Sequence, residues 1–197
     1  MKSILFVALA LVFTVGAVQA AEISTKAGTK ALVFEFNGLS TLGLNPYNGG
    51  IALRYYLSDG LAIRPGVQFG WNQNTVKPTS GNLKNTTTSV GVNAVLEKHL
   101  TGPTSVSPYL GVGASVGYRK VKNEYPASNP ADQNTTSVGV MGVAGFEWGW
   151  TESVTLGGEY TLGFNYSSSK DKLHTGSDSS SMGIAIDSAT LALSVTW

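Results

Sequence analysis

The chain has 197 residues, a formal net charge of +1 and no cysteine, and charged residues make up only 13% of it. That length suits one domain, and the charged fraction lies well below the roughly 25% of ordinary soluble domains. The near-neutral charge gives no reason to expect a nucleic-acid partner, and the lack of cysteine excludes disulfides, thiol chemistry and a lipid-modified N-terminal cysteine.

Residues 1–20 have the composition of a cleavable signal peptide. Lys2 supplies the positive charge, residues 4–15 form an apolar run, and Val18-Gln19-Ala20 fits a signal-peptidase site. A transmembrane anchor is the weaker interpretation, because the run is shorter than the roughly 20 residues that span a bilayer. The sequence therefore predicts an exported protein with a signal peptide at 1–20, a short leader at 21–29 and one domain at 30–197.

Period-two alternation of apolar with small or polar residues fills the rest of the chain and predicts eight strands. They are expected at about 30–39, 50–57, 61–72, 87–99, 108–121, 136–150, 153–166, and from about 182 to 197. The last strand changes phase, since Ile184 and Ile186 are even-numbered whereas the apolar residues from Ala189 to Trp197 are odd-numbered. This predicts a bulge near Asp187 and Ser188, or a strand that begins after them.

The connections alternate in length. Short turns are expected at 58–60, 100–107 and 150–152, the first of them an Asp-Gly turn. Longer polar connections are expected at 40–49, 73–86, 122–135 and 167–181, rich in Asn, Ser, Thr and Lys. We expect these to be mobile, exposed loops on the outer side.

Alternation alone also fits a soluble barrel such as a lipocalin. The residue types on each face of the strands distinguish a soluble barrel from a membrane barrel. The polar face carries many glycines, which would weaken exposed strands but leave room in a narrow lumen for Arg and Tyr side chains. Aromatic residues of the apolar face gather at strand ends in two groups, as expected for the two membrane interfaces. The inner-side belt is Tyr55, Trp148, Trp150 and Trp197, and the outer-side belt is Trp71, Tyr118, Phe164 and Tyr166. The sequence thus predicts an all-β, eight-stranded antiparallel up-and-down barrel in an outer membrane.

Residues 50–66, Gly-Ile-Ala-Leu-Arg-Tyr-Tyr-Leu-Ser-Asp-Gly-Leu-Ala-Ile-Arg-Pro-Gly, resemble a hairpin of the small outer-membrane β-barrel family, the OmpA/OmpX-like proteins. The resemblance implies a Gram-negative-type bacterial outer membrane, insertion by the outer-membrane assembly machinery, and a structural or adhesive role. It also implies that a terminal strand ending in an aromatic residue, here Leu193, Val195 and Trp197, is the assembly signal. The peptidoglycan-binding domain of larger members is not carried over.

Inward-facing charges are expected to pair, because a charge in a narrow lumen needs a partner. The candidates are Glu35, Arg54, Arg64, Glu97, Arg119, Glu147 and Glu159, with Arg119 nearest the outside. We expect an Arg–Glu network between the second, third, fourth and sixth strands. Structural filling of the lumen is the favoured interpretation, and a gate or selectivity filter in a narrow porin-like channel is the alternative.

Catalysis is the least favoured hypothesis, although some outer-membrane barrels are hydrolases or acyltransferases. His99 is expected to be an exposed turn residue, and His174 lies in a serine-rich loop where a Ser/His/Asp match arises by chance. No metal-ligand spacing and no phosphate-binding glycine loop are present, so no cofactor is expected. The expected partners are outer-membrane lipids, the assembly machinery, and a host surface or lipopolysaccharide through the loops, with the protein a monomer.

Overall fold

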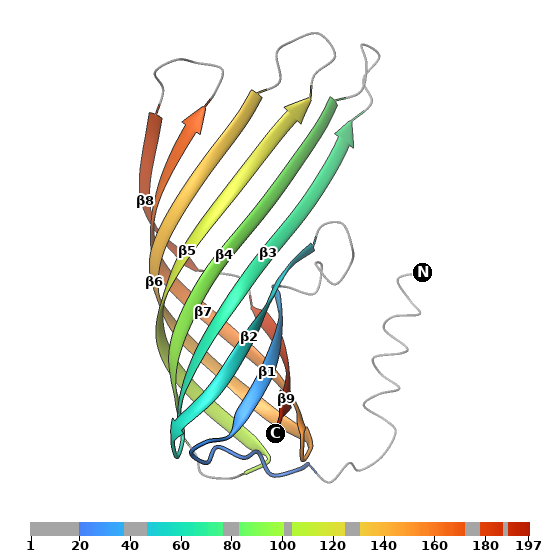
Figure 1. Ribbon diagram of the computed structural model, residues 1–197, viewed down its shortest axis with the longest axis vertical. Coiled ribbons are helices and arrows are strands. Elements are labelled where there is room, and N and C mark those ends of the chain that lie inside the picture. The colour runs from blue at the N-terminus through green and yellow to red at the C-terminus, as the bar shows by residue number, and fades with distance from the viewer. Residues whose placement is uncertain are drawn as a thin grey trace.

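The computed structural model describes residues 20–37, 47–76, 83–100, 104–124, 131–171, 178–186 and 189–197, and folds them into an antiparallel β-barrel (Figure 1). Within these ranges no helix is long and apolar enough to cross a membrane. The expected signal peptide falls almost wholly in residues 1–19, outside the described ranges.

Nine strands form the barrel. They are β1 (Lys30–Asn37), β2 (Tyr47–Ser58), β3 (Leu61–Val76), β4 (Leu83–His99), β5 (Val106–Glu124), β6 (Ala131–Thr151), β7 (Val154–Asp171), β8 (Asp178–Ile186) and β9 (Thr190–Thr196). Strands β1 to β7 pair antiparallel in chain order, and β9 pairs with both β7 and β1 and so closes the ring. The predicted all-β antiparallel barrel is confirmed.

The predicted eighth strand is divided into β8 and β9, which pair with different halves of β7. Leu162 of β7 lies opposite Ile186, and Glu159 lies opposite Thr190, so three steps along β7 correspond to four along the other segment. This extra residue shifts the alternation: Ile184 and Leu191 are both exposed, at 78% and 40%, although one is even-numbered and the other odd-numbered. The phase change read from the sequence is present, and residues 187–188, where we expected it, lie outside the described ranges.

The two faces of the strands differ as the alternation predicts. On β2, Leu53 is 44% exposed whereas its neighbours Ala52 and Arg54 are buried, and on β3 Ile63 is exposed beside buried Arg64. Apolar side chains therefore cover the outer wall and polar ones fill the interior, the reverse of a soluble barrel with an apolar core. This arrangement rules out the lipocalin-like alternative for the described strands.

The outer hairpins are longer than predicted, and the expected long loops are largely strand. Residues 73–76 continue β3, residues 83–86 belong to β4, and residues 122–124 and 131–135 extend β5 and β6. Ser, Thr and Asn occupy both faces there, because water surrounds the hairpin on both sides, and so no apolar alternation marks these strands. At about 3.4 Å per residue and a tilt of roughly 40°, the 21 residues of β6 rise about 50 Å, beyond the ~25 Å apolar band of a bilayer.

Candidate functional site: a closed polar lumen

Two buried arginines and four buried glutamates form one ion-pair network across the lower barrel. Arg54 Nε donates to Glu97 Oε2 at 2.6 Å, and Arg54 Nη1 donates to Glu147 Oε1 at 2.5 Å. Arg64 Nε lies 2.6 Å from Glu97 Oε1, so Glu97 links the two guanidinium groups.

The second guanidinium extends the network to the opposite wall. Arg64 Nη1 donates to Glu35 Oε1 at 2.9 Å, and Nη2 donates to Glu159 Oε2 at 2.6 Å. Together the six side chains come from β1, β2, β3, β4, β6 and β7. The network is thus wider than the four-strand bridge expected from the sequence, and it spans the ring rather than one side of it.

Uncharged polar side chains donate further hydrogen bonds to two of these carboxylates. Tyr109 donates from its hydroxyl to Glu159 Oε2 at 2.9 Å, while Ser194 and Thr155 donate to Glu147 Oε1 at 3.0 and 3.4 Å. Arg54 Nη2 is buried without a hydrogen-bond partner among the described residues. The guanidinium carbon of Arg54 lies 5.6 Å from the centre of the Tyr109 ring, a cation–π contact that offsets part of that loss.

Glycines on the inner face make room for the large side chains, as the sequence suggested. A Cβ at Gly145 would lie 2.5 Å from the Tyr109 ring, and one at Gly113 would lie 3.0 Å from a methyl group of Val95. Neither glycine has a positive φ angle, so other residues could adopt the same backbone conformation. Glycine is needed at both positions because a side chain would collide with its neighbours. The lumen at this level is filled by side chains.

His99 is buried, and the expectation that it is an exposed turn residue was wrong. Its Nδ1 lies 2.7 Å from Ser107 Oγ and its Nε2 lies 3.1 Å from the Tyr56 hydroxyl, and all three residues are at most 3% exposed. The ring shares the parity of Glu97 on β4, which places it inside the barrel. The odd residue number of His99, shared with Glu97, could have predicted this burial from the sequence.

Arg119 lies outside the network. Its side chain is exposed, and its strand neighbours are Ser89 on β4 and Thr135 on β6, far along β5 from Tyr109. The other six predicted lumen charges are the ones that the structure brings together.

The leader runs across the lower end of the barrel, beneath the strands in Figure 1. Its backbone bonds to the turns around that end: Ala21 N donates to Gly149 O at 3.1 Å, Ile23 N to Thr104 O at 3.1 Å, and Gly28 N to Tyr56 O at 2.9 Å. Ile23 is only 4% exposed. Sequence reasoning missed this role, because the segment has no alternation and bonds chiefly through its backbone.

The leader also fixes the first hairpin turn. Gly60 N donates to Thr25 O at 2.8 Å, and Ala27 N donates to the side chain of Asp59 at 2.9 Å. Gly60 has a φ of +71°, which the Asp-Gly pair supplies at low cost. The predicted short turn is therefore present, and the leader binds to it.

Above the network, a polar cavity of about 240 Å³ occupies the interior of the barrel. Its floor includes Glu35, Arg64 and Glu159, and amide side chains such as Gln68 and Asn93 line its wall. The cavity is polar and large enough to hold several water molecules. Water entering from the outer side would therefore stop at the ion pairs.

The predicted belt residues lie at the two ends of the apolar band. Tyr55, Trp150 and Trp197 are exposed toward the lower end, with Trp148 half-buried, and Trp71, Tyr118, Phe164 and Tyr166 are exposed on the outer side. The 12 residues between Val106 and Tyr118 rise about 30 Å at the tilt used above. This matches a bilayer with its interfaces.

One buried pair of side chains has the residue types of a nucleophile and its base. The Ser107–His99 pair resembles part of a nucleophile–base pair, but Ser107 is fully buried and no substrate reaches it. His174 lies outside the described residues.

Comparison with known proteins places the chain among outer-membrane barrels. The chain resembles a major outer membrane protein from Thermus thermophilus, with a TM-score of 0.58 and 12% identity over 86% of this chain and all of that one. Similarity is also found to the N-terminal β-barrel domain of Pseudomonas aeruginosa OprF (TM-score 0.41, 15% identity, 88% of this chain and 100% of that one). A third similar structure is Neisserial surface protein A, NspA (TM-score 0.42, 20% identity, 85% and 94%).

No curated protein sequence matches the chain. A family model described as the outer membrane protein beta-barrel domain matches residues 5–197, nearly the whole sequence. This places the protein in a bacterial outer membrane, with its apolar wall against lipid. The chain belongs to the outer membrane protein beta-barrel domain family.

Proposed function

We propose that the protein is a non-conducting, monomeric outer-membrane barrel with a structural and surface-interaction role, exported through its N-terminal signal peptide. The observation that carries this proposal is the double closure of the lumen by the Arg–Glu network and by the leader. With the interior closed, the polar hairpins on the outer side are the surface that a partner outside the membrane would contact.

Burial of the ion pairs supports closure. Arg54 and Arg64 are 1% and 2% exposed, and Glu97 is fully buried. Opening a path would separate charges in a low-dielectric interior, which costs several kcal/mol for each ion left unpaired. The leader would have to leave the lower end as well.

The outer hairpins support the surface role. They continue the sheet above the outer belt with paired Thr, Ser and Asn side chains, such as Thr135 Oγ1 and Ser169 Oγ at 2.7 Å. Regular strands hold such groups in fixed positions, which favours recognition over mere coverage. A host surface or another cell is the partner class that fits an adhesin of this kind.

A narrow channel for ions is the second candidate, and the polar cavity above the network is the observation that favours it. A membrane-embedded hydrolase or acyltransferase finds no support in the buried Ser107–His99 pair. We propose that the protein uses no cofactor.

Trimming the hairpins tests the surface role. Joining Gln73 to Thr86 and Val121 to Gln133, each through Asn-Gly, keeps the register because these residues are opposite each other. Bacteria displaying the trimmed barrel should adhere to a cultured epithelial layer several-fold less than bacteria displaying the full chain. Heat-dependent gel migration must be kept as the folding control, and unchanged adhesion with a folded barrel would contradict the role.

A further inference from the structure

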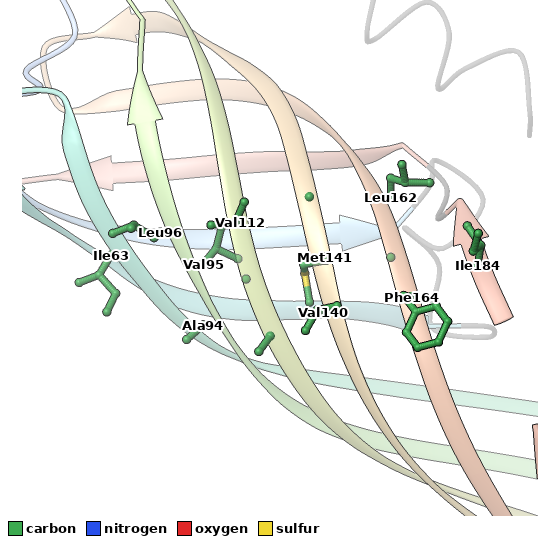
Figure 2. A pocket seen from close by; sticks show the side chains of 14 residues that line it. Ile63, Ala94, Val95, Leu96, Val112, Val140, Met141, Leu162, Phe164 and Ile184 are labelled. Carbon is green, nitrogen blue, oxygen red and sulfur yellow. The ribbon is translucent and has the colours of Figure 1, made fainter. Parts of the chain in front are cut away.

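The lipid-facing wall carries a shallow apolar groove of about 820 Å³ that crosses six neighbouring strands, β3 to β8 (Figure 2). Its central row runs through residues that lie opposite one another in the sheet: Ala94, Ala114, Val140, Phe164 and Ile184. Small side chains at Ala94 and Ala114 deepen the wall there, with bulkier residues at the groove's ends.

Gly142 deepens the same groove. A Cβ at this position would meet only the backbone oxygen of Leu162, at 3.9 Å, so no packing requirement explains the missing side chain. This differs from the glycines of the inner face, such as Gly145, which give way to large neighbours. The hollow is therefore a property of the outer surface.

A patch of charged residues lies above the groove on the same strands and the same face. This lysine patch consists of Lys84 on β4, Lys120, Lys122 and Glu124 on β5, Asp132 on β6 and Lys170 on β7. Lys120 Nζ lies 3.3 Å from Asp132 Oδ2, and Lys122 Nζ lies 2.8 Å from Glu124 Oε1. On β4 to β7, four ammonium groups against two carboxylates leave a surplus of two positive charges, and Asp178 of β8, opposite Lys170, reduces the surplus to one.

The patch lies at the height of lipid headgroups. Lys120 is two residues beyond Tyr118 of the outer belt, about 5 Å further along the membrane normal. Lys120 and Lys170 are both opposite Asn134, so they form one row across three strands. Exposed ion pairs at such a surface contribute little stability and exchange partners readily.

The distance between the groove and the lysine patch matches the distance between the acyl chains and the headgroup of one lipid molecule. Lys120 is six positions along β5 from Ala114, and Lys170 is six positions along β7 from Phe164. That is about 15 Å along the normal, close to half of a ~25 Å apolar band plus its interface. A chain reaching down from the patch would enter the groove, which begins beside Phe164 of the outer belt and includes Ala94, only five residues from the lower end of β4.

We propose that this wall binds a phosphorylated, multiply acylated glycolipid of the outer leaflet, of the lipid A class. The lysine patch holds the phosphate groups and the groove holds acyl chains. A single-chain anion would not fill a groove six strands wide, and a neutral lipid would gain nothing from the surplus positive charge. The site is on the barrel wall rather than in the loops, and it does not depend on whether the lumen conducts.

Native mass spectrometry of the purified full-length barrel in detergent tests this with bis-phosphorylated lipid A as the probe. K120Q/K170Q should weaken binding by roughly tenfold or more, and the loss should shrink as salt is raised. K26Q/K30Q, which removes two exposed lysines near the opposite end, is the matched control and should leave binding unchanged. E124Q/D132N should tighten binding.

Lipid A with both phosphates removed and the variant Gly142→Leu separate the two halves of the site. The dephosphorylated lipid should bind the wild-type barrel about as weakly as lipid A binds K120Q/K170Q. Gly142→Leu should weaken both lipids several-fold, whereas Ala144→Leu, on the same strand and face outside the groove, should not. Equal affinity for the two lipids would overturn the lysine site, and equal effects of the two leucines would overturn the groove.

Discussion

Arg64 contacts three carboxylates with one guanidinium group, those of Glu35, Glu97 and Glu159. Arginine suits this position better than lysine, because its planar fork presents several donors in fixed directions. Removing it would leave three buried carboxylates with only Arg54 nearby. The stability of the lower barrel thus depends on a few residues that the sequence already singled out.

We predict that Arg64→Met lowers the free energy of unfolding by about 3 kcal/mol or more, the cost of leaving buried charges unpaired. Arg119→Met is the matched control, since Arg119 is exposed, and it should change stability by no more than about 0.5 kcal/mol. Urea unfolding of the two variants in lipid vesicles, followed by tryptophan fluorescence, measures the difference. Similar effects of the two substitutions would show that the network does not stabilise the barrel.

Residue parity was enough to predict which side chains enter the lumen, and six of seven candidate charges were found this way. Parity alone does not give height, but Arg119 was already expected nearest the outside, and the structure leaves it exposed, too far along β5 to reach Glu159. His99 was missed for another reason: its position beside Lys98 at a strand end suggested exposure, although its odd number matched Glu97. Its burial depends on Tyr56 and Ser107, which come from other strands.

The leader behaves as a structural element although it contains no regular secondary structure. It is held by backbone hydrogen bonds to four separate segments and by two buried side chains, those of Ile23 and Thr25. Nothing in its composition predicts this, because its partners are backbone groups that only the folded barrel brings together.

Ile23→Ser should release the leader, since burying an isoleucine side chain contributes about 1.5–3 kcal/mol. The barrel itself should remain folded, while the leader becomes cleavable by an added protease at least several-fold faster. Glu22→Ser, at the exposed neighbouring position, serves as the control. A leader equally protected in both variants would mean that Ile23 does not hold it.

Trp197 directly follows β9 and extends its pairing with β1: the backbone N–H of Trp197 donates to Lys30 O at 2.9 Å, and its backbone oxygen accepts from Lys30 N at 3.2 Å. We predict that Trp197→Ser lowers the yield of assembled barrel in cells several-fold. Trp150→Ser removes a tryptophan from the same belt without touching β9. If the two variants assemble equally well, Trp197 acts only as a membrane anchor and not as an assembly signal.

At the level of elements, alternation predicted the strands that cross the membrane and failed for the parts that leave it. Residues 61–71 have lipid on one side and the polar lumen on the other, so apolar residues alternate with small or polar ones along this segment. Above the outer belt water lies on both sides, so Thr86 and Asn85 carry no such mark and look like loop residues. The division of the last strand was visible only as a phase change between Ile186 and Leu191.

The whole molecule combines an apolar outer wall, a filled lower lumen and polar hairpins that rise above the outer belt. Neither the wall nor the hairpins require a closed interior, whereas the proposed non-conducting role does. The ion pairs and the leader close the same end in series, so each should limit conduction by itself.

Single-channel recording of the refolded full-length barrel in planar bilayers tests closure most directly. The wild-type protein should give no discrete conductance steps, and neither should Ile23→Ser, because the Arg–Glu network alone still closes the lumen. Ile23→Ser combined with Arg64→Ala should conduct if the barrel stays folded. Steady conductance steps from the wild-type protein would contradict a closed lumen and favour the channel.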